Sequence, residues 1–170
     1  MKKLVKIIIL QVFWYIAVMY GHLYQYPILV ASLIFALANF FIYRPSVTLK
    51  HYPAVLLIFV LYGMAQEWLF QEVGLVDYNQ DSFPWWLTSL YIVFIAYYGD
   101  LFNYLEKKSL LLHFVMGAVG GIAAYYGGAK ISPIQVQSSL YYLAVGISWG
   151  IFFPLSIKIF YSKVFFKSVV

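Results

Sequence analysis

Acidic side chains are the residues in this chain best suited to chemistry, and they gather in one stretch. Four of the six Asp and Glu residues lie between residues 63 and 86, in the segment GMAQEWLFQEVGLVDYNQDSFPWW. Long apolar runs flank this segment on both sides. Carboxylates are costly inside a lipid bilayer, where they mark proton relays, substrate sites or ion pathways. The search for function therefore begins here.

Glu67 is the acid that lies deepest within an apolar run. Gly63, Glu67, Gln71 and Gly74 recur at near-helical spacing, which places small and polar residues on one helix face. Glu67 and Gln71 are thus predicted to be buried. One interpretation makes Glu67 a carboxylate that binds a proton or orients a substrate in a cavity. The alternative is a carboxyl group that bonds to a neighbouring helix and fixes packing, and the sequence favours neither.

A second predicted polar layer lies near the opposite ends of the helices and contains Gln11, Asp100 and His113. Only a short connection, residues 106–108, separates the segments that carry Asp100 and His113, so these two side chains are expected to be neighbours. An Asp that orients a His is common in proton relays and acid–base sites. Because no Ser, Thr or Cys is convincingly placed as a nucleophile beside them, a buried structural pair is the preferred interpretation.

The rest of the acidic stretch is predicted to form an external acidic and aromatic face, made of Glu72, Asp77, Asp81, Trp85 and Trp86. Oxygen ligands would suit a hard divalent cation, but the spacing of these acids matches no calcium-loop pattern. A solvated loop is the simpler interpretation of the acids. A belt of aromatic residues at the membrane surface explains the two Trp residues. We therefore predict no metal site.

Small residues recur along a later apolar segment at Gly117, Gly120, Gly121, Ala124 and Gly128. Such small-xxx-small patterns allow the backbones of two helices to approach closely. A phosphate-binding glycine loop would need a preceding strand and a following Lys-Ser/Thr pair, and the sequence has neither here. These residues are therefore predicted to serve helix packing.

Composition predicts a membrane protein. The 170 residues are 64% hydrophobic, 22% aromatic and only 10% charged, with a mean hydropathy of +0.84. Soluble domains carry about 25% charged residues, so this chain has too few to cover a water-soluble globule. Its apolar residues form long runs rather than the alternating pattern of a β-barrel, which predicts an all-α fold. The absence of Cys excludes thiolate chemistry, and no cofactor is predicted.

Six transmembrane helices are predicted, in one integral membrane domain that covers residues 1–170. Their approximate ranges are 4–21, 28–43, 53–73, 84–105, 109–126 and 138–160. With six spans, ten of the eleven Lys and Arg residues fall on the side of the two termini, and only Lys130 falls on the other. Because Lys and Arg are enriched in cytoplasmic loops, both termini are predicted to be cytoplasmic. These flanking positions also account for the net charge of +5, so no nucleic-acid partner is expected.

Short residue patterns recur along the chain in a particular order. They are Gln11-x-x-Trp14-Tyr15, a Gly63-x10-Gly74-x-x-Asp77 element, Pro84-x-Trp86-Leu87 with Phe94, and Gly117-x-x-Gly120-Gly121 with Tyr125 and Gly128. Over roughly residues 10–133, their order and spacing resemble the small bacterial inner-membrane family catalogued as domain of unknown function 2878. The resemblance implies a multi-pass protein of the bacterial inner membrane. It assigns no activity and no catalytic residues.

Two polar layers without a recognisable catalytic group favour a non-enzymatic function. We expect the protein to bind or organise a membrane lipid or a lipid-modifying membrane protein through its external acidic and aromatic face. A second copy of the chain, forming a homodimer, is the other expected partner. The first alternative is a small proton-coupled transporter or flippase that uses Glu67. The second is an intramembrane lipid-modifying enzyme, with Asp100 and His113, or Glu67 and Asp77, as acid and base.

Overall fold

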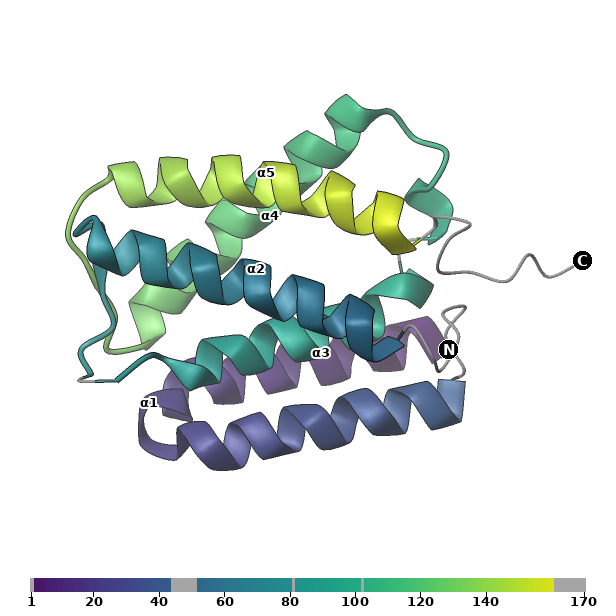
Figure 1. The fold of residues 1–170 in the computed structure, drawn as a ribbon, viewed down its shortest axis with the longest axis horizontal. Helices are drawn as coiled ribbons and strands as arrows, with labels where there is room; N and C mark the ends of the chain where they lie inside the picture. The colour runs from purple at the N-terminus through teal and green to yellow at the C-terminus, as the bar shows by residue number, and fades with distance from the viewer. Residues whose placement is uncertain (1, 44–51, 81, 102, 161–170) are drawn as a thin grey trace, which may run out of the picture.

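The described part of the protein is a bundle of α-helices. A computed structural model describes residues 2–43, 52–80, 82–101 and 103–160. Its helices are α1 (Lys2–Tyr43), α2 (Tyr52–Glu72), α3 (Trp85–Leu101), α4 (Leu110–Ile131) and α5 (Leu140–Phe160). A 3-10 helix, Asn103–Leu105, and two short strands, β1 (Val76–Asp77) and β2 (Gln135–Val136), complete it. The predicted all-α class is thus confirmed (Figure 1).

The long helix α1 is a hairpin rather than one straight rod. Its backbone leaves helical geometry at Tyr24, with φ −125° and ψ 38°, and its two halves run side by side in opposite directions (Figure 1). The rings of Phe13 and Phe35 lie 5.6 Å apart, whereas a straight helix would separate them by about 33 Å. Pro27 falls in the first turn after the break, where the missing N–H removes no helical hydrogen bond.

Four described helices, α1, α2, α4 and α5, are long and apolar enough to cross a membrane. The stretch in α1, Leu4–Phe41, has 38 residues, and a straight helix of that length would be about 57 Å long. The fold at Tyr24 therefore divides it into two shorter halves. Large apolar side chains such as Leu111 (71% exposed) and Phe41 (66% exposed) cover the outside of the bundle. This exterior is suited to lipid rather than water, which indicates a membrane protein.

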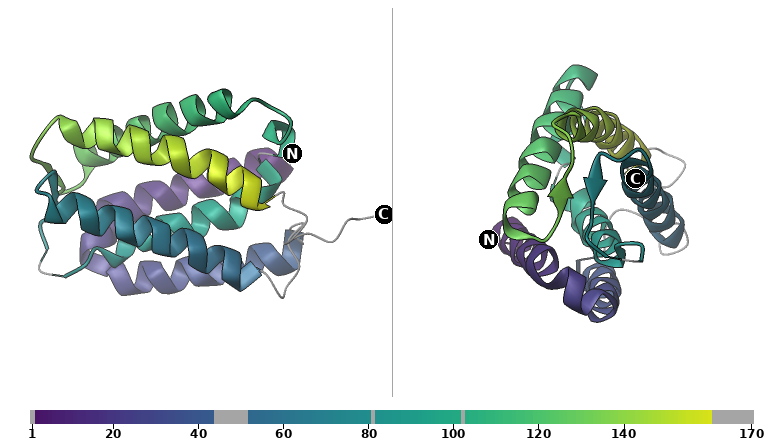
Figure 2. Two further views of the ribbon diagram at one scale, coloured as in Figure 1. Left: turned by 45° about the horizontal axis from the view of Figure 1, so that its top comes forward. Right: turned by 90° about the vertical axis from the view of Figure 1, so that its left-hand side faces the viewer.

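Helix α3 lies inside the bundle. It packs mainly against the α1 hairpin, while α4 packs mainly against α5, and α2 contacts both α3 and α5. The two views in Figure 2 show α4 crossing the other helices obliquely. Residues along α3, among them Val93 and Ile95, are fully buried. Helices α1 and α4 meet only sparsely.

A helix-ending motif and a small β-ladder shape one end of the bundle. Gly74 adopts a left-handed φ of +70° just after α2, the Leu75 N–H donates to the carbonyl of Phe70, and the Gly74 N–H donates to that of Gln71. This pairing of bonds is a Schellman motif, for which Gly is the preferred residue. The chain then enters β1, which pairs antiparallel with β2 in the register Val76 to Val136. The loop after α2 is thereby tied to the loop before α5.

The opposite end of the bundle holds two helix ends and one connection between helices. The first turn of α1, the last turn of α5 and the link between α3 and α4 all lie at this end, away from β1 and β2 (Figure 1). Helix α4 starts there at the N-cap Ser109, whose side chain accepts from the N–H of Leu112. It continues to Ile131, beyond the range of 109–126 taken from the sequence. Helix α3 ends at Leu101 and gives way to the 3-10 turn.

Candidate functional site

Glu67 lies at the centre of a buried hydrogen-bond cluster. Its side chain is 1% exposed. The Tyr91 hydroxyl and the Gln66 Nε2 donate to Glu67 Oε1 at 2.8 Å and 3.0 Å, and the Tyr125 hydroxyl donates to the same oxygen. The Tyr78 hydroxyl donates to the other oxygen, Oε2. Three phenols and one amide from α2, α3, α4 and the β1 loop therefore converge on one carboxyl group.

Gln66 extends the cluster to α5. Its Nε2 lies 3.0 Å from the Tyr91 hydroxyl and 3.1 Å from the Tyr125 hydroxyl. Its carbonyl oxygen accepts from the Ser148 hydroxyl at 2.5 Å, and the Tyr62 hydroxyl lies 2.7 Å from the Ser148 oxygen. Buried polar groups in lipid must find partners within the protein, and this cluster joins α2, α3, α4 and α5 to satisfy them.

Local features of the sequence bring these groups together. Gly63, one turn before Glu67, lets the ring of Tyr91 lie against α2, because a Cβ at this position would come within 2.5 Å of that ring. The Schellman motif at Gly74 turns the chain sharply, and the β-ladder then holds the following loop. The side chain of Tyr78 is thereby placed next to Glu67, to which its hydroxyl donates. The spacing between Gly63, Glu67 and Gly74 thus reflects the construction of this cluster.

Hydrogen-bond counting fits an ionised Glu67. An ionised carboxylate only accepts, and its two oxygens offer about four lone-pair positions, enough for the hydrogens of the three phenols around it. If Tyr91 and Tyr125 donate to Glu67, the two N–H groups of Gln66 can serve their phenolic oxygens. Burial, followed by the Glu67 carboxylate, raises the pKa of Tyr78 well above its ordinary range. Tyr78, in the loop after α2, therefore remains a donor at physiological pH.

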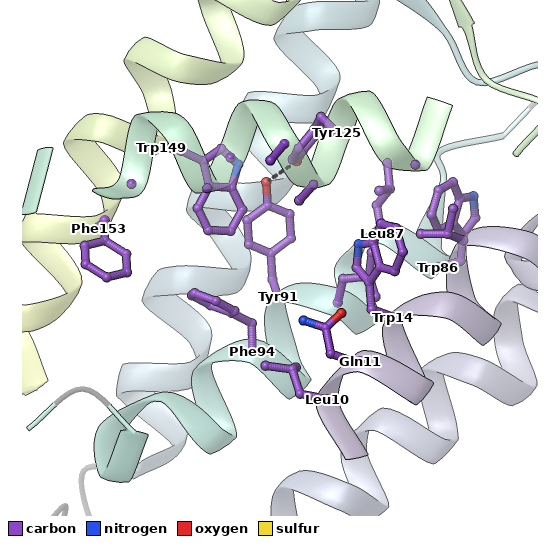
Figure 3. A pocket seen from close by; sticks show the side chains of 18 of the residues that line it. Leu10, Gln11, Trp14, Trp86, Leu87, Tyr91, Phe94, Tyr125, Trp149 and Phe153 are labelled. Carbon is purple, nitrogen blue, oxygen red and sulfur yellow. Dashed lines mark hydrogen bonds between the residues drawn. The ribbon is translucent and has the colours of Figure 1, made fainter. Parts of the chain in front are cut away.

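A cavity of about 540 Å³ lies beside this cluster, between the first half of α1, α3 and α4. Its walls are mostly aromatic or small, and include Trp14, Phe94 and Gly120. Tyr91 and Tyr125 also line it, and their hydroxyls face one another 2.8 Å apart among the lining residues (Figure 3). The cavity thus has mostly apolar walls and a polar edge formed by the hydroxyls of Tyr91 and Tyr125. Both hydroxyls are hydrogen-bonded to Glu67.

The predicted polar residues occupy different parts of the molecule. Gln11 is exposed and lines the cavity, and Gln71 is exposed near the end of α2 rather than buried. Gln71 lies in the last turn of α2, one turn beyond Glu67. His113 is buried at the opposite end, with Nε2 2.8 Å from the Leu105 carbonyl oxygen. The side chain of Asp100 lies outside the described residues, so the expected pairing with His113 does too.

The predicted external face divides into exposed and buried residues. Glu72 and Asp77 are exposed, and Asp77 Oδ1 accepts from the Asn79 N–H at 2.7 Å. Asp81 lies outside the described residues, and Trp85 is half-buried. Trp86, however, is only 1% exposed. It packs so closely on Gly21 that a Cβ there would lie 2.5 Å from the indole, so Trp86 is a core residue rather than part of an exposed aromatic face.

The small residues of α4 serve two faces. A Cβ at Gly117 would lie 2.3 Å from the Trp149 carbonyl oxygen, and one at Gly121 would lie 2.6 Å from the Trp149 Cβ, so both positions allow close packing on α5. Gly120 instead has open space around a hypothetical Cβ. It lines the cavity together with Ala124 and Gly128. The same pattern therefore allows close packing on α5 and forms a wall of the cavity, which Gly117 and Gly121 line as well.

The residues that sequence reasoning missed are the partners of Glu67. With 17 Tyr in the chain, residue type alone could not single out Tyr78, Tyr91 and Tyr125. One usable signal was the position of Tyr91 and Tyr125, since a phenol within an apolar segment needs a hydrogen-bond partner. Tyr78 lies in a loop and carried no such signal. Within the described ranges, no group of three or more His, Asp or Glu side chains is placed to hold a metal ion.

Comparison with known proteins places the chain in a family. The family described as protein of unknown function (DUF2878) matches residues 3–155, a longer stretch than the 10–133 expected from the short patterns. This range includes every residue of the Glu67 cluster. No curated protein and no solved structure matches the chain. Because the match covers most of its 170 residues, the chain belongs to the DUF2878 family of proteins of unknown function.

Proposed function

We propose that this protein binds a single-chain amphiphile of the membrane, with the apolar chain in the 540 Å³ cavity and the polar group at the hydroxyls of Tyr91 and Tyr125. One observation carries the proposal: the polar edge of an apolar cavity consists of two hydroxyls that converge on a buried carboxylate. Ligand pockets have volumes of about 300–1,000 Å³ and combine apolar walls with a few oriented polar groups.

The surroundings of the cavity favour a ligand from the bilayer. Two of the helices around it, α1 and α4, carry apolar stretches long enough to cross a membrane. Because these helices meet only sparsely, an apolar chain has a route between them that avoids water. The wall formed by Trp14, Phe94 and Gly120 offers such a chain only apolar contacts. The cavity is therefore a better candidate for binding than the outer acidic face, whose Glu72 and Asp77 are exposed.

The membrane topology belongs to the same proposal. The protein crosses the bacterial inner membrane six times, with each half of α1 and the short helix α3 as separate spans, and both termini are cytoplasmic. The distribution of Lys and Arg supports this orientation. Because the chain has no Cys, single Cys substitutions can test it directly. A membrane-impermeant maleimide applied to intact cells should label Lys130→Cys and spare Lys107→Cys, and the reverse pattern would refute the orientation.

The binding proposal can be tested by filling the cavity. Gly120→Leu adds a side chain where the cavity has open space, whereas Val119→Leu enlarges the neighbouring residue, which is 62% exposed on the outside. The probe is hexadecanol carrying a photoreactive diazirine, added to the purified protein in lipid nanodiscs. We expect labelling of the cavity wall around Phe94 to fall at least fivefold in Gly120→Leu and to stay unchanged in Val119→Leu. Equal labelling in both variants would refute the proposed site.

A second candidate function, proton-coupled transport, is favoured by the position of Glu67. The carboxylate lies between the tyrosines of the cavity and Tyr78, which belongs to the loop at the end of the bundle. A group in this position could link events in the cavity to proton exchange at that end. Uptake of the same amphiphile into proteoliposomes under a pH gradient should then be lost in Glu67→Gln, and unchanged gradient-driven uptake would remove this candidate.

A further inference from the structure

We infer that the cavity selects amphiphiles whose polar group donates a hydrogen bond, such as a long-chain alcohol or amine, over long-chain carboxylates. This inference rests on the proposed function and names the chemical class of its ligand. It follows from which acceptors the hydrogen atoms of the Glu67 cluster already bind.

The phenolic hydrogens at the polar edge of the cavity are already used. Tyr91 and Tyr125 both contact Glu67 Oε1, and their hydroxyl oxygens lie 2.8 Å from each other. Each phenol has one hydrogen. Whether both hydrogens go to the carboxylate or one goes to the other phenol, both remain inside the cluster. Gln66 Nε2 also lies 3.0 Å and 3.1 Å from these two oxygens and can use one lone pair of each. The phenols therefore offer a ligand at most their other lone pair, and a ligand must donate to bind there.

A negative charge on an ionised Glu67 acts in the same direction. The four partners that donate to Glu67 are uncharged: Gln66, Tyr78, Tyr91 and Tyr125. Because the carboxylate is completely buried, water screens its field only weakly. A ligand carboxylate would meet both acceptor lone pairs and a like charge one hydroxyl away. A protonated amine meets lone pairs and an opposite charge, and a hydroxyl group satisfies the hydrogen-bond requirement alone.

The remaining polar atoms at the cavity include donors as well as an amide that can accept. Gln11 lines the cavity with an amide that can either donate or accept. The indole nitrogens of Trp86 and Trp149 are buried and lack hydrogen-bond partners among the described residues. An indole N–H donates to a hydroxyl oxygen or, more strongly, to a carboxylate, whereas a protonated amine offers it no acceptor. Of the three polar groups, only a hydroxyl can both donate to the phenols and accept from an indole. The requirement for a donor comes from the hydroxyls of Tyr91 and Tyr125.

Three matched photoreactive probes test this inference: the diazirine forms of hexadecanol, hexadecylamine and hexadecanoate, which differ only in the polar group. In nanodiscs at neutral pH, we expect the alcohol and the amine to label the cavity wall about five- to tenfold more than the carboxylate, the ratio expected for one net hydrogen bond. Equal or stronger labelling by the carboxylate would overturn the inference while leaving the binding proposal intact. If none of the probes labels the cavity above the lipid-facing surface, the binding proposal itself fails.

Two variants separate the contributions. Tyr125→Phe keeps the ring and removes one acceptor oxygen, so labelling by the alcohol should fall towards that of the carboxylate. Glu67→Gln removes the buried charge, so the disadvantage of the carboxylate relative to the amine should shrink at least threefold. Val119→Leu is the control and should preserve all three levels. Unchanged selectivity in both Tyr125→Phe and Glu67→Gln would overturn the inference.

Discussion

The hydrogen bond between Tyr78 and Glu67 provides the sharpest test of the buried cluster. The perturbation is a double-mutant cycle that combines Tyr78→Phe, which removes only the hydroxyl, with Glu67→Met, which replaces the carboxylate with an apolar side chain of similar length. The cycle is informative because the tyrosine and the carboxylate come from different elements, the β1 loop and α2. Their coupling therefore reports directly on the tertiary structure.

The structure indicates why the single variant Glu67→Met is not a sufficient test. Glu67→Met leaves Tyr91, Tyr125 and Gln66 able to pair with one another. It leaves about two phenolic donors without an acceptor, which costs about 1–3 kcal/mol each. It also removes the cost of burying the carboxylate, which is several kcal/mol. These opposing contributions are similar in size. The sign of the change in unfolding free energy for Glu67→Met alone therefore decides nothing.

The coupling energy has a definite expected sign. In the wild-type background, Tyr78→Phe removes a hydrogen bond to a charged group, which is worth about 1.5–3 kcal/mol in soluble proteins. Measured hydrogen-bond couplings within membranes average about 0.6 kcal/mol and reach about 1.7. Because Tyr78 belongs to a loop at the end of the bundle, we expect a coupling of about 1–2 kcal/mol. In the Glu67→Met background, Tyr78→Phe should cost nothing or be slightly stabilising.

The assay is reversible unfolding in mixed micelles with increasing dodecyl sulfate, followed by Trp fluorescence, for the wild type and the three variants. Tyr20→Phe serves as a control in both Glu67 backgrounds, because Tyr20 is 46% exposed, and it should change the unfolding free energy by less than about 0.5 kcal/mol. If Tyr78→Phe costs the same with Glu67 and with Met at position 67, the proposed contact does not stabilise the protein and the reasoning is refuted.

Glycine substitutions test the close approaches that build the site, with thermal unfolding in detergent as the measurement. Gly63→Ala should destabilise by about 1–3 kcal/mol, because its Cβ would lie 2.5 Å from the ring of Tyr91. Gly120→Ala should be neutral or stabilise by up to about 1 kcal/mol, because its surroundings are open and Ala favours the helix; equal losses at both positions would contradict the described packing. Gly74→Ala should cost about 1–2 kcal/mol through its left-handed φ of +70°, and an unchanged melting temperature would argue against the Schellman turn.

Much of the architecture follows from residue type and order. Apolar runs of helical length can satisfy their backbone groups in lipid only as helices, so the all-α class could be deduced from composition. The interruption near Tyr24 was marked by nearby Gly and Pro residues, although the helix resumes before Pro27. Glu67 was identifiable as a costly acid in an apolar segment. In each case the signal is local, because it depends on neighbours along the chain.

The partners of Glu67 could not be predicted in the same way. Tyr78, Tyr91 and Tyr125 are three of 17 tyrosines, and their relation to one carboxylate depends on how α2, α3 and α4 pack. The β1–β2 ladder involves two residues in each strand, too few to leave a periodic pattern. Trp86 illustrates the same difficulty, since a Trp at the start of a helix suits both a membrane-surface belt and the buried site against Gly21 that it occupies.

The sequence by itself determined that this chain forms apolar helices and that Glu67 needs a compensating environment, because both follow from the cost of polar groups in lipid. Only the tertiary structure decided what that environment is. It brings the phenols of Tyr91 and Tyr125 to one carboxyl oxygen and leaves a cavity beside them, lined by the α4 face that contains Gly120. That convergence depends on the angles between helices, which are set by side-chain packing across the whole bundle.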